Sequence, residues 1–347
     1  MRVIVVGAGY AGVIAANRLR RRSDARVTVI NPRPDFVQRI RLHQHIADTG
    51  AATVPLADML RPGIDVHVGT VDKIGDGALR VEGGSELEFD RLVYTVGAGV
   101  AAPAGTFGVG TWEAAVAARE ALRALASGGR VTVAGAGLTG IETAAEVAAA
   151  RPDLAVRLVG PELGASLSDS GRARAARGLA ELGVEIVRDT VEPARSEADL
   201  VLWAVASAVP DLAARSGFEV DGAGRVLVDA HLRSVRDPRV FAAGDGAAVP
   251  GTRMSCQAAM PQGAYVGGAV AREATGRPLP RPFSMSFTGQ CVSLGRRDGV
   301  IQLCRRDDSP TRLRLAGHGA AVVKEQVCRA TVLGARTAVY AWLPGKR

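Results

Sequence analysis

The chain has 347 residues, of which 47% are hydrophobic and 22% are charged, so it is long enough for two substantial domains and too apolar to be disordered. Its net charge of +8 fits either an arginine-rich surface in general or attraction to an anionic membrane face or an acidic substrate. Nucleic-acid binding is not expected, because no recognition motif accompanies the charge and aromatic residues make up only 4% of the chain.

The first 31 residues predict a strand, a turn, a helix and a second strand. Apolar residues 3–6 precede a G-x-G-x-x-G fingerprint at 7–12, and an Ala-rich helical stretch follows. The glycines allow a tight strand-to-helix turn and the close approach of a pyrophosphate, which rests on the N-terminus of the helix. The second strand, 26–30, ends at Asn31, whose amide could bond a ribose or could simply form a turn before the next proline.

Residues 36–50 concentrate arginine, histidine and amide side chains in one short segment. Beyond this segment the alternation of apolar and polar residues predicts several short strands. They are expected at 66–74, at the hairpin arms 79–81 and 86–89, and over 90–98, where a buried strand ends on glycine.

A second copy of the fingerprint follows a change in composition after Pro103. An Ala-rich helix is predicted over 111–126, and apolar residues 131–134 then lead into a glycine turn at 135–140 and a helix that ends near residue 150. One fingerprint alone is weak evidence, but two in the same register are strong evidence for two dinucleotide sites. That arrangement suits an enzyme that passes a hydride from a nicotinamide to a flavin.

The strands predicted after the second fingerprint form two sets. Those at 154–159, 184–187 and 200–206 continue the second unit. Those at 226–228 and 240–246 resemble the strands of the first unit and are assigned to it. No low-complexity linker appears, so the second unit is predicted to be inserted in the first.

The predicted fold is therefore α/β, with two Rossmann-like three-layer domains and a small C-terminal α+β segment. The first domain is expected to comprise 1–105 and 215–280, the second 106–214, and the C-terminal segment 281–347. In the tail, apolar residues of 320–343 do not fall on one helical stripe, and Gly334 interrupts them. The tail is expected either to pack onto the body or a second copy, or to contact a membrane surface.

Cysteine spacing and hydropathy exclude further classes of protein. The four cysteines form no C-x-x-C pair and no zinc-like spacing, so we expect free thiols in a reducing cytoplasm, no dithiol relay and no metal site. No window of about 18 uninterrupted apolar residues occurs, so no transmembrane helix is expected.

The order of these motifs resembles the two-dinucleotide-binding-domain flavoproteins of the pyridine nucleotide-disulfide oxidoreductase superfamily. The resemblance runs from Val3 to about Val270 and is closest to type II NADH:quinone oxidoreductases and their soluble relatives. It implies that the first fingerprint binds FAD and the second binds NAD(P)H. It also implies that residues 36–50 lie beside the flavin ring and that Gly244-Asp245 closes over the flavin.

Three residues are candidates for catalysis. Glu142 follows the second glycine turn and matches the family's glutamate near the nicotinamide–flavin contact, where it could relay a proton; a solvated glutamate on the helix surface is the alternative. Gln257 begins a motif that resembles the quinone-side motif of the family, although Pro261 replaces its middle glutamine. That proline must lie in the first helical turn or kink the helix predicted over 257–271. Gln257 is either a contact of the flavin or acceptor, or a capping amide, and His43 is either a proton-transfer group or structural.

The candidate cofactor-binding residues come from both fingerprints, from strand ends and from the family motifs. They are Gly7, Gly9, Tyr10, Ala11, Gly12, Asn31, Arg33, Arg39, Val71, Thr95, Gly97, Gly135, Gly137, Leu138, Thr139, Gly140, Glu162, Ala204, Gly244, Asp245, Gln257 and Ala258. Glu162 favours NADH because it could bond a ribose hydroxyl, whereas Arg172 and Arg174 could instead meet the 2′-phosphate of NADPH.

The sequence thus predicts an FAD-dependent NAD(P)H dehydrogenase that passes electrons to a quinone or another small acceptor. A flavoenzyme acting directly on a specialised metabolite and a redox-sensing FAD/NAD(H)-binding protein are the alternatives. A cytoplasmic protein is expected, with peripheral contact to the inner membrane face and homodimer formation as open questions.

Overall fold

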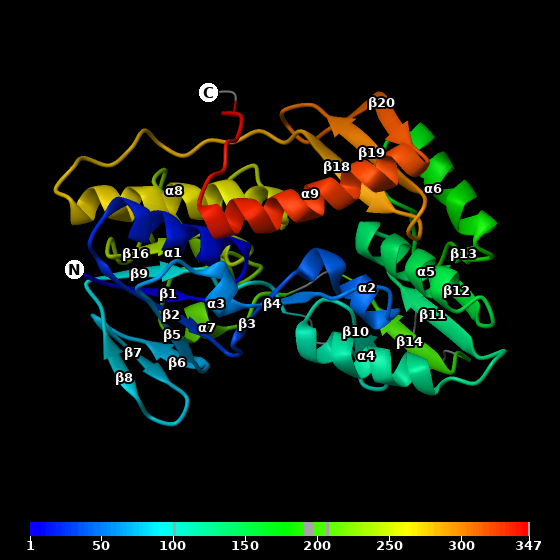
Figure 1. The fold of residues 1–347 in the computed structure, drawn as a ribbon, viewed down its shortest axis with the longest axis horizontal. Helices are drawn as coiled ribbons and strands as arrows, with labels where there is room; N and C mark the ends of the chain where they lie inside the picture. The colour runs from blue at the N-terminus through cyan, green and yellow to red at the C-terminus, as the bar shows by residue number, and fades with distance from the viewer. Residues whose placement is uncertain (100–101, 191–196, 206–207, 346–347) are drawn as a thin grey trace.

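Two parallel five-stranded sheets of similar topology dominate the protein (Figure 1). The computed structural model describes residues 1–99, 102–190, 197–205 and 208–345. The first sheet has the order β16-β9-β1-β2-β5, with β1 (Arg2–Val6), β2 (Arg26–Asn31), β5 (Ile64–Val68), β9 (Arg91–Tyr94) and β16 (Val240–Ala242). The second has the order β10-β14-β11-β12-β13, with β10 (Phe107–Gly108), β11 (Arg130–Ala134), β12 (Ala155–Val159), β13 (Glu185–Val187) and β14 (Leu200–Trp203).

The sheets repeat one strand–helix–strand unit. Helix α1 (Tyr10–Arg22) joins β1 to β2, and α5 (Leu138–Ala150) joins β11 to β12 in the same way. Because β16 of the first sheet follows the whole second sheet along the chain, the second unit is inserted in the first. This topology confirms the predicted α/β fold with two Rossmann-like units. The domain boundaries near 105 and 215 stay predictions, which the strand order supports.

The other elements surround these two sheets. They are β3 (Asp35–Val37), the 3-10 helix η1 (Arg39–Arg41), α2 (Leu42–Ile46), β4 (Thr53–Pro55), α3 (Leu56–Met59), β6 (Val71–Ile74), β7 (Ala78–Val81), β8 (Glu86–Glu88), α4 (Trp112–Ala124), α6 (Asp169–Glu181), α7 (Leu212–Arg215), β15 (Val226–Leu227), β17 (Ala247–Ala248), α8 (Cys256–Ala274), β18 (Gly289–Ser293), β19 (Gly299–Cys304), β20 (Pro310–Ala316) and α9 (His318–Thr337).

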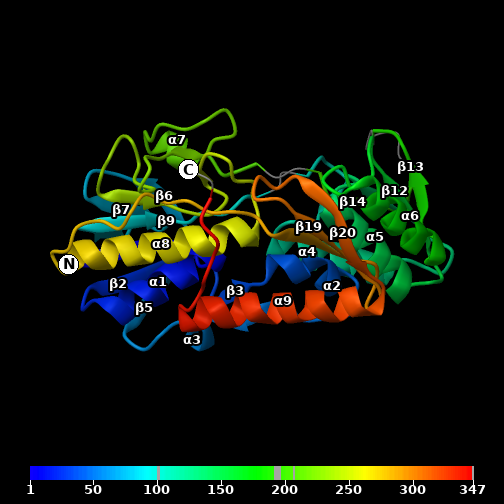
Figure 2. The same cartoon turned by 90° about the horizontal axis from the view of Figure 1, so that it is seen from above.

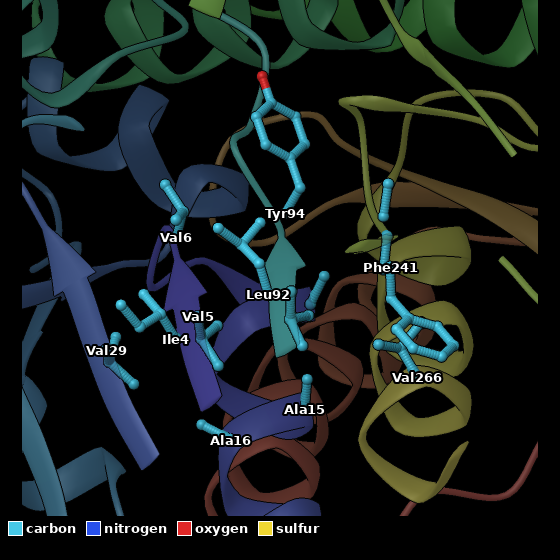
Figure 3. Packing of buried hydrophobic residues seen from close by; sticks show 14 of the residues in the cluster. Ile4, Val5, Val6, Ala15, Ala16, Val29, Leu92, Tyr94, Phe241 and Val266 are labelled. Atoms are coloured by element: carbon cyan, nitrogen blue, oxygen red, sulfur yellow. The ribbon is translucent and has the colours of Figure 1, made fainter. Parts of the chain in front are cut away.

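Helices α1 and α8 pack closely over the first sheet. A Cβ added to Gly263 would lie 2.3 Å from the carbonyl oxygen of Ala11, and one added to Gly267 would lie 2.4 Å from that of Ala15. Figure 3 shows the buried side chains beneath them, among them Phe241 of β16 and Val266 of α8. Small residues on both helices therefore bring the N-terminal end of α8 close to the first glycine turn.

Two predicted strands are shorter in the structure. The prediction of one strand over 66–74 is wrong, because the Gly69 amide donates to the carbonyl oxygen of Asn31 and ends β5 there, while β6 pairs antiparallel with β7 in another sheet. The strand predicted over 200–206 ends at Trp203, and its last residue lies outside the described part of the chain.

The tail forms the predicted small α+β segment, although one continuous helix over its second half was not expected. It forms a three-stranded antiparallel sheet, β18-β19-β20, and the 20-residue helix α9, which runs along the molecule from beside β20 to beside α3 (Figure 2). One stripe of α9 is buried, and it consists of Ala320, Lys324, Cys328, Thr331, Gly334 and Ala335. The helix escaped prediction because this stripe is small and polar, whereas Val322, Val323 and Val327 are exposed. Within the described ranges, no helix is long and apolar enough to cross a membrane.

Candidate functional site

The first and third glycines of each fingerprint are required by the backbone itself. Gly7 and Gly135 have φ angles of +98° and +105°, a region that side chains rarely adopt. A Cβ on Gly12 would lie 1.9 Å from the carbonyl oxygen of Gly7, and a Cβ on Gly140 would lie 1.7 Å from that of Gly135. The sequence repeat therefore produces two equivalent turns.

The middle glycines, Gly9 and Gly137, face open space. No protein atom of the described chain lies within 4 Å of a Cβ placed on either residue. They are the N-caps of α1 and α5, and neither helix has a side-chain cap, whereas side chains cap α4, α6 and α8. Two helix N-termini thus present free N–H groups at sterically open turns, which fits the diphosphates of FAD and of a pyridine nucleotide.

A cavity of about 770 Å³ joins the two units. From the first unit it is lined by residues 7–11, by the end of β2 and by residues 95–99; from the second, by Thr139, Glu142 and residues 203–205. A space lined by both units can hold two cofactors end to end. Arg33, Arg39, Val71, Gly244 and Asp245 also line it, as expected of cofactor-binding residues.

Several predicted residues shape the first turn through hydrogen bonds. The Asn31 side-chain oxygen accepts from the Ala8 N–H (3.0 Å), and its NH₂ group donates to the Arg33 carbonyl (2.7 Å). These bonds occupy the amide, so of the two interpretations of Asn31 the structural one has direct support. The Thr95 hydroxyl lies 2.8 Å from the Gly7 carbonyl oxygen and supports the turn from the next strand.

Arg39 connects the two units across the cavity. It donates to Asp245 (3.0 Å) and to the Gly110 carbonyl oxygen (3.0 Å). The preceding Gly244 N–H donates to the side chain of buried Gln262 (2.7 Å), in the matched Gln-Gly of the family motif. Asp245 is thereby fixed at the cavity wall.

Glu142 lies in a buried polar cluster at the inner end of the cavity. Its Oε1 accepts from the backbone N–H (2.9 Å) and the hydroxyl (3.2 Å) of Ser293, and Lys324 of α9 forms an ion pair with the same carboxylate. His43 Nδ1 lies 4.0 Å from Glu142 Oε2. Glu142 is therefore not a freely solvated surface glutamate, because its side chain is only 13% exposed, and the structure brings together two of the three predicted catalytic residues.

Burial governs the protonation of this cluster. It lowers the pKa of Lys324 to about 8. Burial, followed by the charges of Lys324 and Arg296, lowers the pKa of His43 well below its usual value, so the imidazole is neutral at pH 7. One turn beyond Glu142, the side chain of Glu146 is fully buried against Thr49, and burial raises its pKa.

Lys324 is the residue that sequence reasoning missed. It belongs to the C-terminal tail, where α9 turns it inward. It lies 182 positions after Glu142, so no local pattern could pair the two. The signal available in the sequence was the small-residue spacing of the buried stripe around it.

Other predicted residues lie elsewhere. Gln257 and Ala258 are not among the described residues that line the cavity. Assigned from its neighbours, the Gln257 amide donates to the Gly289 carbonyl oxygen (3.0 Å) and accepts from the Thr288 N–H (3.1 Å), which ties the start of α8 to the strand β18. Its neighbour Cys256 does line the cavity, and burial raises the pKa of this thiol to about 11.

Two further expectations are corrected or refined. Pro261 is the sixth residue of α8, beyond the first turn, and the helix continues through it. Glu162 is exposed and pairs with Arg172 (2.9 Å), away from the residues that line the cavity.

The remaining candidate residues shape the turns without lining the cavity; they are Gly12, Gly135, Gly137, Leu138 and Gly140. In the described chain, no group of three His, Cys, Asp or Glu residues is placed to hold a metal ion.

Two dinucleotide-type turns joined by one cavity define a flavin- and pyridine-nucleotide-dependent oxidoreductase. The chain belongs to the pyridine nucleotide-disulphide oxidoreductase family, whose sequence profile matches residues 1–263. The predicted family is thereby confirmed, and the protein is an FAD-dependent oxidoreductase of the NADH dehydrogenase-like type.

Comparison with individual proteins agrees with this assignment. An NADH dehydrogenase-like protein of Mycobacterium tuberculosis is 33% identical over 80% of this chain and 82% of its own length. The type II NADH:quinone oxidoreductase Ndh of the same organism is 28% identical, over 87% of this chain and 79% of its own. Among solved structures, the sulfide:quinone oxidoreductase of Aquifex aeolicus shares the fold with a TM-score of 0.80 at 16% identity, covering 97% of this chain and 92% of that one.

Proposed function

We propose that this protein transfers a hydride from NADH to FAD and then passes the electrons to a quinone-like acceptor. The observation that supports this proposal is one shared cavity, which is lined by the first glycine turn, by Thr139 and by Glu142. A shared cavity allows the two rings to meet at the contact distance that hydride transfer needs. The relative named a type II NADH:quinone oxidoreductase supports the choice of acceptor.

Each unit would hold one cofactor. In residues 1–105 and 215–280, the Gly9 turn would receive the FAD diphosphate and Asp245 a hydroxyl of its chain. In residues 106–214, the Gly137 turn would receive the NADH diphosphate, with Ala204 at the cavity wall. When bound, FAD supplies a two-electron carrier between nicotinamide and acceptor.

Three ion pairs favour NADH over NADPH. Arg172 is engaged by Glu162 (2.9 Å) and by Asp169, and Arg174 is engaged by Asp298. A 2′-phosphate would have to compete with these carboxylates for the two arginines. We therefore propose that NADH is the better donor.

The polar cluster around Glu142 would supply the second proton that quinone reduction needs. A quinone gains two electrons and two protons, of which the hydride provides both electrons and one proton. Glu142, between the cavity and Lys324, is placed to hold and deliver the second proton. Neutral His43 limits solvent at the same end of the cavity. Gln257 would not contact the acceptor; it would hold the start of α8 against residues 288–289.

Anaerobic mixing with NADH or NADPH tests the function. We expect NADH to bleach the bound flavin faster than NADPH, and the reduced enzyme then to reduce a soluble quinone. Oxygen, ferricyanide and quinones should be compared as acceptors. The proposal fails if neither nucleotide bleaches the flavin, or if an organic substrate turns over without any nucleotide.

We also propose peripheral contact between the C-terminal segment and an anionic membrane. Of fourteen large apolar side chains exposed in the described chain, nine lie within residues 303–343, among them Leu313 on β20 and Leu333 on α9. Exposed Arg312 and Arg336 flank these two positions. Apolar side chains next to arginine suit an anionic lipid surface.

Co-sedimentation with anionic and neutral vesicles tests this contact. The protein is expected to sediment with anionic vesicles, and the double variant Leu313→Ser/Leu333→Ser is expected to bind at least about fivefold more weakly. Val235→Ser, at an exposed apolar position outside the segment, is the matched control. Light scattering that shows a stable dimer, lost in the double variant, would instead assign these residues to a second copy of the chain.

A further inference from the structure

A second, smaller cavity lies behind the Glu142 cluster. It has a volume of about 250 Å³ and is bounded by α9, by the end of β18 and by Gln44 of α2. Val322 and Gln326 on its rim are exposed, so it opens at the protein surface. Its size and the polar side chains among its lining residues allow several water molecules.

The two cavities meet at a group of hydrogen-bonded side chains. Ser293 and Lys324 line the small cavity, and Glu142 lines the large one. The Ser293 hydroxyl lies 3.1 Å from Lys324 Nζ and 3.2 Å from Glu142 Oε1. A hydrogen-bonded connection therefore runs from the small cavity to Glu142 at the wall of the large cavity.

Charged groups surround the small cavity. Arg296 lies 3.5 Å from Glu325 and 3.9 Å from buried Glu146. Arg41 holds the same Glu325 carboxylate with two hydrogen bonds, at 2.8 and 3.0 Å. These groups fix the rim of the cavity between α2 and α9.

We propose that this small cavity is the proton inlet of the enzyme, that Lys324 connects it to Glu142, and that Ser293 is the positioning residue that holds these two groups together. The inference rests on the proposed quinone reduction. In that reaction the nicotinamide C4–H bond breaks and gives two electrons and one proton, and the quinone takes these together with one proton from water. Nicotinamide, flavin and acceptor fill the large cavity during turnover, so this water-derived proton needs a separate route.

Access to Lys324 can be measured without turnover. The chain has three lysines, Lys73, Lys324 and Lys346, so acetylation of each by acetic anhydride can be followed by mass spectrometry. The variant Ala321→Phe places a ring in the small cavity, and Val323→Phe, on the exposed side of α9, is its control. In the FAD-bound protein we expect Ala321→Phe to slow acetylation of Lys324 at least about tenfold, with exposed Lys73 unchanged in both variants.

The pH dependence of the same reaction has a defined sign. An amine reacts when it is neutral, and burial lowers the pKa of Lys324 to about 8. Acetylation of Lys324 should therefore rise through a midpoint near that value. Equal acetylation of Lys324 in the wild type and in Ala321→Phe would overturn the inlet, whatever the enzyme's acceptor.

The role of Ser293 is read from a ratio of two activities. Ferricyanide takes electrons without protons, whereas a quinone takes both, so the quinone-to-ferricyanide turnover ratio reports proton delivery. Ser293→Ala is expected to lower this ratio about tenfold and to raise the solvent isotope effect on quinone reduction, and Ser293→Thr is expected to restore both. Ala321→Phe should lower the ratio as well.

The outcomes separate the two proposals. Equal losses with both acceptors in Ser293→Ala would overturn the positioning role of Ser293. A wild-type enzyme that bleaches with NADH and reduces ferricyanide but no quinone would refute the proposed acceptor instead. The acetylation result would still decide whether the small cavity admits solvent to Lys324.

Discussion

Replacing Gly137 with valine is expected to leave a folded, FAD-containing protein that NADH reduces at least about a hundredfold more slowly at low concentration, a loss of roughly 2.7 kcal/mol in nucleotide binding. Gly137 has an extended backbone, with φ of −71° and ψ of 179°, that valine can adopt. A Cβ there meets no protein atom within 4 Å, so the new side chain fills only the space offered to the diphosphate. Stopped-flow flavin reduction and the melting temperature measure the two effects.

Two matched variants complete this test. Gly319→Val, on the exposed start of α9, also places its Cβ in open space and should keep the wild-type reduction rate. Gly9→Val should show the reciprocal behaviour, with loss of bound FAD from a folded protein. If Gly137→Val lost FAD and kept NADH binding, the assignment of the two turns would be reversed.

The substitution Glu142→Gln is expected to reduce quinone turnover about a hundredfold or more, because it removes the group that holds the proton. It should also lower the melting temperature by several degrees, since it leaves the buried Lys324 ammonium without its carboxylate partner. Steady-state turnover with a soluble quinone and thermal unfolding give the two readouts.

A double variant separates these effects. In Glu142→Gln/Lys324→Met both charges are gone, so the melting temperature should recover while quinone turnover stays low. Glu185→Gln, which breaks an exposed ion pair with Arg157, should change neither quantity appreciably. Recovery of turnover in the double variant would exclude Glu142 as the proton-holding residue.

The topology and both glycine turns could be predicted because their causes are local. A left-handed φ at Gly7 and at Gly135, and the contact of each third glycine with the first, depend on residues within one short segment. The same holds for the hairpin β7–β8. The split of 66–74 into two strands depended instead on which sheet each half joins, and that information is not local.

The surroundings of Glu142 show the opposite case. Its position after the second turn marked it as a candidate, but Ser293 and Lys324 reach it from segments more than 150 positions away. Gln257 shows the same limit, because its motif suggested the acceptor, whereas the chain folds Thr288 and Gly289 against its amide. A side chain with two possible partners is assigned only when the long-range packing is known.

The sequence by itself determined the family, the two dinucleotide units and the insertion of one in the other, because glycine spacing and apolar periodicity act through near neighbours. Only the tertiary structure decided that α9 buries Lys324 against Glu142 and leaves a second cavity behind it. A stripe of small and polar residues has no hydrophobic signature of its own, so its burial follows from the surface onto which it packs.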